Sequence, residues 1–438
     1  MDDWEFVKTL GSFMPEDFGI LHGALIFFIL IMYTKWGNYS RLLRRFDFYQ
    51  GYHKVHELLT LDDDVNPQRL FDHIGMTRSQ FLALTHKLRV SKKVKDGSSV
   101  SIEEKLMLFL CVCKRSFQYQ AGLTFNRAAS NTSKAVNEVL TAIISLKSEY
   151  VSLNNQYVAH IVDDYRYRHF FDNGNLPLGA FDGTHIGMNL TNKHENCQRK
   201  WWSTEGPCTN VFAAINFILE FVFVFAGWEG SAHDSRVLTD ARNFGFREVP
   251  LAGILYHFYW LADKAYSLSP WCLTPFMGQR YHLGQFDAFA PATREELFNF
   301  YHASLRNYIE RGFGILKKRY PILLSMNAYS LAKQIKMIEA CFILHNFIIV
   351  TPRLPTELED IYLKEAQDII EFEKLNNANI LNLDLPPAGH IFPNPDQGVN
   401  PAGLDAGADA VAWRYRIADA MWADYLAYRQ QNDLAGPQ

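Results

Sequence analysis

The stretch Leu178-Gly-Ala-Phe-Asp-Gly-Thr-His-Ile-Gly187 decides the fold of the central part of the chain. Its apolar residues predict a buried strand that carries one acid, Asp182, immediately before Gly183. We therefore expect the strand to end at Asp182 and the backbone to turn at Gly183. A carboxylate at the tip of a core strand is costly to desolvate unless it meets a cation. The alternative role of Asp182 is to cap the turn, because Asp often precedes Gly in turns.

A second strand and a later helix bring further acids. Residues 253–266 begin with aromatic and aliphatic side chains typical of a strand, and Asp263 stands at the carboxyl end of that strand. Residues 295–317 carry apolar side chains at helical spacing, and Glu310 borders this apolar stripe. Two carboxylates from strand ends and one from a helix can hold two divalent ions that promote phosphodiester cleavage. Because every ligand is an oxygen, Mg2+ or Mn2+ suits such a site.

Five segments resemble, in family order, the DDE transposases of the PIF/Harbinger superfamily and their domesticated nuclease relatives. The segments are Gly-Ala-Phe-Asp-Gly-Thr-His (179–185), Ala-Gly-Trp-Glu-Gly-Ser-Ala-His-Asp-Ser-Arg-Val-Leu (226–238), Leu-Ala-Asp-Lys-Ala-Tyr (261–266), Leu-Arg-Asn-Tyr-Ile-Glu-Arg-Gly-Phe-Gly-Ile-Leu-Lys (305–317) and Cys-Phe-Ile-Leu-His-Asn (341–346). The resemblance implies an RNase H-like fold and metal-dependent cleavage and transfer of DNA strands. It also implies that Asp182, Asp263 and Glu310 are the catalytic residues.

Asp234 is a fourth acid in these segments. It begins a predicted helix over residues 234–244, where Asp is a favourable N-cap. It could instead be a metal ligand, or a partner that orients one. We prefer Asp263 as the second catalytic acid, because an RNase H-like sheet carries its second acid on the fourth strand. Strands expected near residues 178, 210, 221 and 256 place Asp263 on that strand.

The region before the first acid is expected to be helical. Residues 68–89 show helix signals, with Thr77 and Ser79 as caps, and further helices are predicted over 101–113, 117–125 and 132–144, with Ser101 and Glu104 forming a capping box. The last three resemble a helix-turn-helix, which the family places here. In that interpretation Ser130, Asn131, Ser133, Lys134 and Asn137 face the DNA, and Arg127 lies on its phosphates. The alternative is a plain helical bundle whose polar residues are solvated.

Further candidates for DNA contact lie near the expected acids. Residues 192–207 form a basic, aromatic loop that could hold a DNA backbone and stack on an unpaired base, through Lys193, Arg199, Lys200 and Trp201. A solvated hairpin loop is the alternative. Lys264, Arg306 and Arg311 border the acids themselves. Since Arg306 precedes Glu310 by one helical turn, an ion pair within the helix is expected, and phosphate clamping is the alternative.

Composition sets the broad class. The chain has 438 residues, a formal net charge of −4 and 48% hydrophobic residues, as expected of a globular protein of two or three domains. The slightly acidic total argues against a strongly basic DNA binder but leaves room for a local basic patch. The six cysteines contain no Cys-x-x-Cys pair, so we expect reduced thiols and no zinc site.

The two ends differ from the centre. The apolar run at 18–33 is shorter than the ~20 residues that span a bilayer, so it favours a buried or partner-facing helix over a membrane anchor. After residue 352 we expect an acidic helix over 354–375, a Pro-rich linker and an amphipathic helix over 404–429.

The predicted fold class is α/β. An RNase H-like catalytic domain, with a mixed sheet flanked by helices, follows an all-α helix-turn-helix-like domain. The expected units are an N-terminal segment (1–65), the helical domain (66–155), the nuclease domain (156–350) and a C-terminal extension (351–438).

The predicted function is that of a metal-dependent DNA endonuclease or transposase that cleaves transposon ends and joins them to target DNA. The alternative is a domesticated, non-catalytic DNA-binding or scaffold protein. The resemblance further implies double-stranded DNA as substrate, a Myb-like partner protein and a nuclear location reached with that partner's help. We also expect a homo-oligomer and two bound Mg2+ or Mn2+ ions, and no membrane association.

Overall fold

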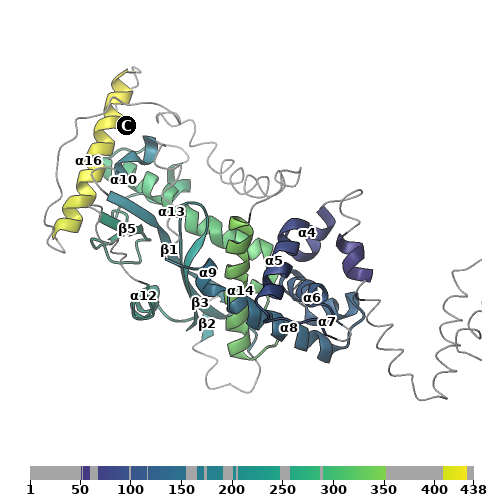
Figure 1. Ribbon diagram of the computed structural model, residues 1–438. Coiled ribbons are helices and arrows are strands. Elements are labelled where there is room, and N and C mark those ends of the chain that lie inside the picture. Colours follow the sequence, from purple (N-terminus) through teal and green to yellow (C-terminus); the bar gives the residue numbers. More distant parts are fainter. Residues whose placement is uncertain are drawn as a thin grey trace, which may run out of the picture.

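The computed structural model describes residues 51, 53–59, 68–97, 100–115, 117–153, 165–171, 175–190, 201–203, 206–246, 257–286, 290–351 and 408–431. A helical part lies on one side of the molecule, and a mixed sheet flanked by helices lies beside it (Figure 1). The expected fold class, α/β with a preceding helical region, is confirmed. Among the described residues, none of the helices is both long and apolar enough to cross a membrane.

The sheet has the strand order of an RNase H-like domain. Its strands are β1 (Asn175–Gly187), β2 (Trp202–Ser203), β3 (Gly206–Ile215), β4 (Phe221–Glu229), β5 (His257–Leu261) and β6 (Cys272–Leu273). β1, β3 and β4 form an antiparallel meander, and β5 and β6 add in parallel on the other side of β1. The central strand β1 therefore pairs with both halves of the sheet.

Strand β1 continues past the first acid, contrary to expectation. Its antiparallel pairing with β3 runs without interruption from Ala180 opposite Ile215 to Gly187 opposite Cys208. Gly183 therefore lies within the strand and makes no turn. The prediction of a turn was wrong because the sequence Asp-Gly has two uses, and here the missing side chain gives room to a neighbouring group.

Two apolar layers enclose the sheet. Alternate residues of β3 point to opposite faces, as strand geometry requires. One face packs on α13 (Arg294–Arg319), including Leu305 and Ile309. The other face, with Phe181 and Phe212, packs on α12 (Asp234–Asn243). Consequently α12 and α13 carry their acids to opposite faces of the same strands.

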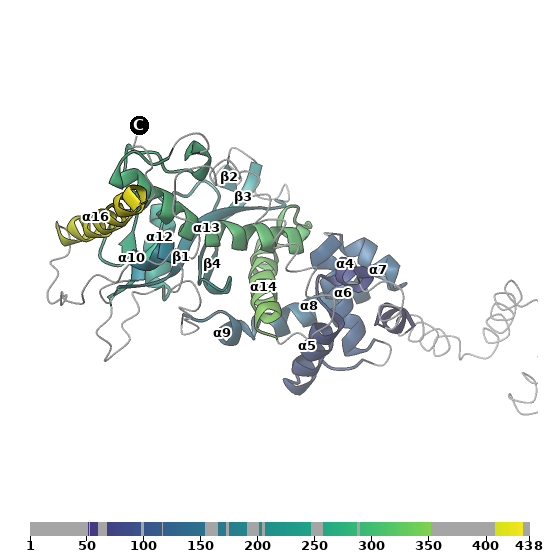
Figure 2. The same ribbon diagram turned by 90° about the horizontal axis from the view of Figure 1, so that it is seen from above.

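Helix α14 (Leu331–Val350) joins the sheet to the helical part. It is apolar around most of its circumference, which is typical of a helix buried on several sides. It packs against β4 on one side and α8 on another, as the view from above shows (Figure 2). The Asn346 amide pairs with both backbone groups of Phe221, as a neighbouring strand would. Asn346 therefore ties α14 to the start of β4.

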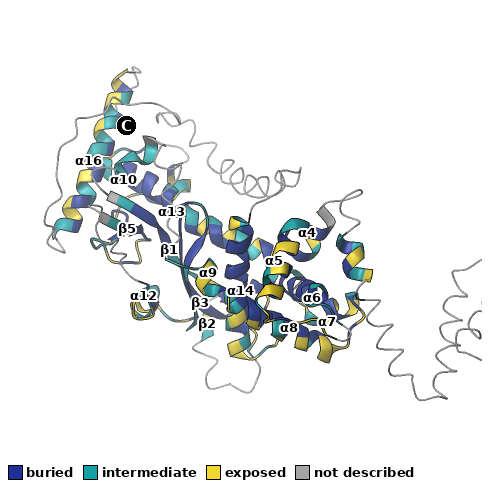
Figure 3. Cartoon of the chain, in the orientation of Figure 1, coloured by how far each residue is buried: buried dark blue, intermediate teal, exposed yellow. Residues whose placement is uncertain are grey.

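The helical part precedes the sheet in the chain. Its helices are α4 (Gln68–Ile74), α5 (Arg78–Val90), α6 (Ile102–Arg115), α7 (Gln118–Thr124), α8 (Ala129–Ile144) and α9 (Lys147–Tyr150). The region with helix signals over 68–89 forms two helices, because Gly75 adopts a positive φ of 75° between them, and the expected cap at Thr77 is confirmed. Thr77 then caps α5 in a complete capping box. Burial is concentrated where α6 and α8 face each other (Figure 3).

Helix α16 (Ala408–Gln431) lies at the far side of the sheet from the helical part (Figure 1). It is the helix expected over 404–429. Trp413 packs its ring edge against Tyr259 with ring centroids 4.8 Å apart. Asp424 forms ion pairs with Arg168 and His169 of α10 (Arg168–Phe171). The expected segments at 18–33 and 354–375 and the Pro-rich linker lie outside the described residues.

Candidate active site

The first and second predicted acids lie at the same level of two neighbouring parallel strands, Asp182 within β1 and Asp263 just past the end of β5. β1 and β5 are paired up to Ala180 opposite Leu261. Asp182 and Asp263 each follow two residues later, so they stand at the same level of the sheet. The Asp182 side chain is 21% exposed, whereas Asp263 follows the end of β5 and is partly exposed. This juxtaposition depends on the parallel pairing of two strands that are about 80 residues apart in sequence.

Glu310 reaches the same place from α13 through an arginine. The Arg306 Nη1 atom donates to Asp182 Oδ2 at 2.8 Å, and its Nη2 atom donates to Glu310. The ion pair expected between Arg306 and Glu310 is therefore present. Only 7% of the Arg306 side chain is exposed, against 53% of Glu310. The guanidinium thus lies between the first and third predicted acids.

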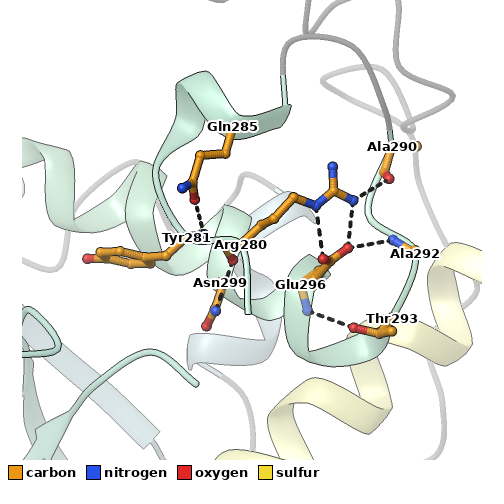
Figure 4. A network of polar contacts seen from close by, with 8 residues as sticks. All are labelled: Arg280, Tyr281, Gln285, Ala290, Ala292, Thr293, Glu296 and Asn299. Atoms are coloured by element: carbon orange, nitrogen blue, oxygen red, sulfur yellow. Dashed lines mark hydrogen bonds and ion pairs between the residues drawn. The ribbon is translucent and has the colours of Figure 1, made fainter. Parts of the chain in front are cut away.

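The third partner of Arg306 is Tyr281, from the loop between β6 and α13. The Arg306 Nε atom donates to the Tyr281 hydroxyl at 2.6 Å. Figure 4 shows how this loop is fixed: the Arg280 guanidinium binds both carboxylate oxygens of Glu296, and Asn299 binds the loop backbone. The Tyr281 ring points away from that pair, towards Arg306. The loop network therefore holds Tyr281 where it can receive the arginine.

Asp234 approaches β1 from the opposite face. A Cβ atom at Gly183 would lie 2.6 Å from Asp234 Oδ1, so the glycine is needed for this close approach. The Asn210 Nδ2 atom of β3 donates to the same Oδ1 at 2.8 Å. Asp234 is the first residue of α12, and His233 is the N-cap, so the capping role expected for Asp234 is wrong by one position. Its carboxylate binds Asn210.

The charges of these acids interact. Burial, with a smaller contribution from the charges of Asp263 and Asp234, raises the pKa of Asp182 to about 6, although Arg306 acts in the opposite direction. Burial alone would lower the pKa of the Arg306 guanidinium, but contact with Tyr281, Glu310 and Asp182 raises it above its usual range. The site therefore combines mutually repelling carboxylates with one buried cation that offsets them.

The donor atoms at this site fit a hard divalent cation. In the described part of the chain, no three His, Cys, Asp or Glu side chains are gathered closely enough to hold a metal as they stand. Asp182 and Asp263 nevertheless offer oxygens from adjacent strands. Asn210 Oδ1 is buried without a hydrogen-bond partner beside Asp234, so it is an unsatisfied oxygen acceptor. An all-oxygen set of this kind suits Mg2+ or Mn2+.

Basic side chains lie near the acids at the predicted positions and at one position that was not predicted, Lys317. Lys264 is exposed directly after Asp263. Arg311 is partly exposed and lies over the Tyr308 ring, 5.1 Å from its centroid. Lys317, on α13, donates to Thr184 Oγ1 at 2.9 Å and to the His185 carbonyl at 3.0 Å. Arg306 differs from these, because its three donor nitrogens already have acceptors within the protein.

The DNA contacts predicted in the helical part have different outcomes. Residues Asn131 and Lys134 are exposed on α8 and Ser133 is partly exposed, so their DNA contact stays a prediction. Arg127 is buried, with its Nε and Nη2 atoms 2.5 and 2.8 Å from the two carboxylate oxygens of Glu104. The expectation that Arg127 lies on phosphates was wrong in this conformation. The Glu104 carboxylate binds Arg127, and the Glu104 amide donates to Ser101 Oγ, which is one of the two bonds of the expected capping box.

The predicted basic loop is largely untested. Lys193, Arg199 and Lys200 lie outside the described residues. Trp201 is partly exposed directly before β2, and Trp202, the first residue of β2, is 52% exposed. An exposed indole beside a strand remains compatible with stacking on an unpaired base.

Three residues at the site were missed from the sequence. Asn210 could have been found, because it is a polar residue within an otherwise apolar strand. Lys317 lies in the last turn of α13, where the sequence indicates only a favourable interaction with the helix dipole. Tyr281 lies in a loop with no periodic pattern, and only the fold brings it to Arg306. The sequence carried no signal for that contact.

Comparison with known proteins agrees with this geometry. Residues 181–346 match the family described as DDE superfamily endonuclease, and that range contains all four acids. Residues 48–145 match a family described as a domain of unknown function (DUF8040). No solved structure is similar enough to count as a match.

The chain is also similar to two curated proteins. "Protein ALP1-like" of Arabidopsis thaliana is 28% identical over 186 residues, which are 39% of this chain and 42% of the relative. "Putative nuclease HARBI1" of Xenopus laevis is 23% identical over 296 residues, which are 65% of this chain and 79% of the relative. The chain thus spans less than half of the first relative and about four fifths of the second. By this match and these two relatives, the chain is similar to the DDE superfamily endonucleases and to a putative nuclease.

Proposed function

We propose that this protein is a divalent-metal-dependent DNA endonuclease of the transposase type, with Asp182, Asp263 and Glu310 as its catalytic residues. The observation that carries the proposal is the position of Asp182 beside Asp263 on parallel strands, with Glu310 joined to Asp182 through Arg306. The pairing of β1 with β5 and the contacts of Arg306 bring carboxylates from three distant parts of the chain towards one place, which favours a functional site over an ordinary solvated surface.

Each residue has a role in this proposal. Asp182 and Asp263 would hold a divalent ion between their strands, and Glu310 would contribute a further ligand from α13. When bound, such ions supply an activated hydroxyl nucleophile and stabilise the leaving oxygen of a phosphodiester. Asn210 orients Asp234, which is either a further ligand or a neighbour that adjusts the charge of the site.

The substrate would be double-stranded DNA at transposon ends, followed by joining to a target. Lys264, Arg311 and Lys317 supply positive charge around the acids for the DNA backbone. Asn131, Ser133 and Lys134 of α8, with Trp201 and the loop residues Lys193, Arg199 and Lys200, would add contacts further away. The net charge of −4 supports a Myb-like partner that provides part of the DNA affinity and nuclear entry. A homo-oligomer would hold two DNA ends together.

A second candidate function is a non-catalytic DNA-binding or scaffold protein derived from a transposase. The observation that favours it is that the Arg306 guanidinium binds both Asp182 and Glu310. A cation of the protein itself therefore takes the oxygens that a metal ion would need.

Cleavage of duplex DNA in the presence of Mn2+ distinguishes the two functions. The proposal predicts cleavage by the wild type and its loss in Asp182→Asn and Glu310→Gln, with unchanged circular dichroism. Asp240→Asn is the matched control, since it removes an acid from α12, the helix that begins with Asp234. Absence of cleavage by the wild type, with the Myb-like partner and terminal repeats supplied, would support the scaffold function.

A further inference from the structure

The side chain of Arg306 is placed where a cation is needed. It is almost fully buried, and its three donor nitrogens bond to Tyr281, Asp182 and Glu310. A guanidinium this far from water has a large desolvation cost, which its partners must offset. The two acids it joins are the ones that the proposed catalytic site would use. The arginine therefore competes with any other cation for the same oxygens.

Its position is fixed independently of the acids. Tyr281 accepts from Arg306 Nε and lies with its ring centroid 5.8 Å from the guanidinium carbon. Burial of Tyr281 and the Arg280–Glu296 pair of the same loop keep this acceptor in place (Figure 4). An arginine that served only as an i,i+4 surface pair with Glu310 would need no third, buried partner.

We propose that Arg306 is a positioning residue that acts as an internal counter-cation: it holds Asp182 and Glu310 in register without metal, and it must release them when a divalent ion binds. This inference rests on the proposed function, because it assigns a regulation to the same site. The protein would thus bind metal more weakly than its acids alone would allow. In return, the carboxylates stay ordered despite their mutual repulsion.

The test is Mn2+ binding by the full chain, measured by electron paramagnetic resonance of the free ion. Arg306→Gln is expected to bind Mn2+ about tenfold more tightly than the wild type, a typical coupling between two competing ligands of one site. Arg306→Lys, which keeps the charge, should lie near the wild type. Arg416→Gln removes an exposed arginine on α16 and is the control for net charge.

Thermal unfolding provides a second measurement on the same variants. Without metal, Arg306→Gln should melt below the wild type, because its acids lose their counter-charge. Mn2+ should raise its melting temperature by more than that of the wild type, since tighter binding stabilises the folded state more. If Arg306→Gln does not fold, Tyr281→Phe serves instead. It leaves all acids in place and removes only the acceptor of Arg306 Nε, so a severalfold gain in Mn2+ affinity is expected.

Two results would overturn the inference in different ways. Equal or weaker Mn2+ binding by Arg306→Gln, with binding still lost in Asp182→Asn, would reject the counter-cation role and leave the proposed function standing. Mn2+ binding that is unaffected by Asp182→Asn in every background would reject the proposed metal site itself, and the inference with it.

Discussion

Two buried arginines of this protein look alike and differ in what surrounds them. Arg127, in the helical part, forms an ion pair with Glu104 in which the side chains are 3% and 1% exposed. Arg306, beside the sheet, is similarly buried, but its acids Asp182 and Glu310 are 21% and 53% exposed. We call the first arrangement closed, because both the arginine and its acid are buried. We call the second open, because its arginine is buried but its acids reach solvent.

The difference separates a structural ion pair from a candidate site. In the closed pair both charges satisfy each other, so the pair fixes the packing of α6 against the segment before α8. In the open arrangement the acids face outwards and lie near two further acids, which raise the pKa of Asp182. A buried arginine is therefore informative only together with the exposure of its partners.

The largest expected effect concerns the open arrangement. Replacing Asp263 by Asn should reduce metal-dependent DNA cleavage roughly a thousandfold, because the metal stabilises the transition state by several kcal/mol. Asp234→Asn should cause a smaller loss if Asp234 only adjusts the site. Cleavage rates at saturating Mn2+ measure both variants. If Asp234→Asn lost more cleavage activity than Asp263→Asn, Asp234 would be the second catalytic acid in place of Asp263.

Mutation of the closed pair, Arg127 and Glu104, should lower the stability of the fold without changing DNA cleavage. Glu104→Gln leaves the Arg127 charge buried without its acid, so we expect a loss of about 3–5 kcal/mol in the free energy of unfolding. Urea titration followed by circular dichroism measures it. The matched control is Glu138→Gln, whose pair with Lys105 is partly exposed and should contribute no more than about 1 kcal/mol. A similar loss of unfolding free energy in Glu104→Gln and Glu138→Gln would contradict the distinction between a buried and a partly exposed ion pair.

A third buried arginine, Arg319, has a histidine in place of an acid. Burial lowers the pKa of His345 to about 3, with a further contribution from Arg319, so this ring is neutral in the folded protein. The unfolded chain binds a proton near pH 6.5, and folding therefore becomes less favourable as pH falls from 6.5 towards 3. The expected loss from His345 is about 2 kcal/mol at pH 5.

Urea unfolding of wild type and His345→Gln at pH 7 and pH 5 isolates this contribution. The variant should lose about 2 kcal/mol less between the two pH values than the wild type does. The comparison between proteins is necessary, because Asp182 acts in the opposite direction. Its folded-state pKa is raised, so stability increases as pH falls through about 6. Equal pH dependence in both proteins would mean that His345 does not titrate as described.

The smallest effects come from two glycines. Gly183→Ala places a Cβ atom 2.6 Å from Asp234 Oδ1, so it should displace that carboxylate and lower Mn2+ affinity about tenfold. Gly314→Ala on α13 has no atom within 4 Å and should stabilise the protein by about 0.5–1 kcal/mol without changing Mn2+ affinity. Mn2+ titration and thermal unfolding check both. Unchanged affinity in Gly183→Ala would show that Asp234 does not contribute to the site.

Much of the fold could be predicted from sequence, because the strands and helices near the acids have clear patterns. The antiparallel hairpin of β3 and β4, helix α13 and the fourth strand before Asp263 follow directly from periodicity and order. The extent of β1 was wrong, since Asp182-Gly183 also occurs inside a strand where another group needs the space. The cap at Thr77 was predicted, but α4 was not separated as a helix of its own, because a single glycine such as Gly75 does not always end a helix.

The candidate site was harder to predict, because its contacts depend on tertiary structure. Spacing indicated the Arg306–Glu310 pair, but the contact of Arg306 with Asp182 requires α13 to lie across β1. Tyr281 has no pattern of its own and reaches the site only through the network around Arg280 and Glu296. Arg127 looks like a surface cation in sequence, and its burial depends on Glu104, which lies 23 residues away.

The central claim is that Asp182, Asp263 and Glu310 form one divalent-metal site. Cleavage of the protein's own backbone by Fe2+ tests it most directly, because Fe2+ substitutes for Mg2+ and generates hydroxyl radicals where it binds. With ascorbate and peroxide, the account predicts fragments that end close to positions 182, 263 and 310, and their loss in Asp182→Asn. Fragments at other positions, or fragments that persist in Asp182→Asn, would contradict it.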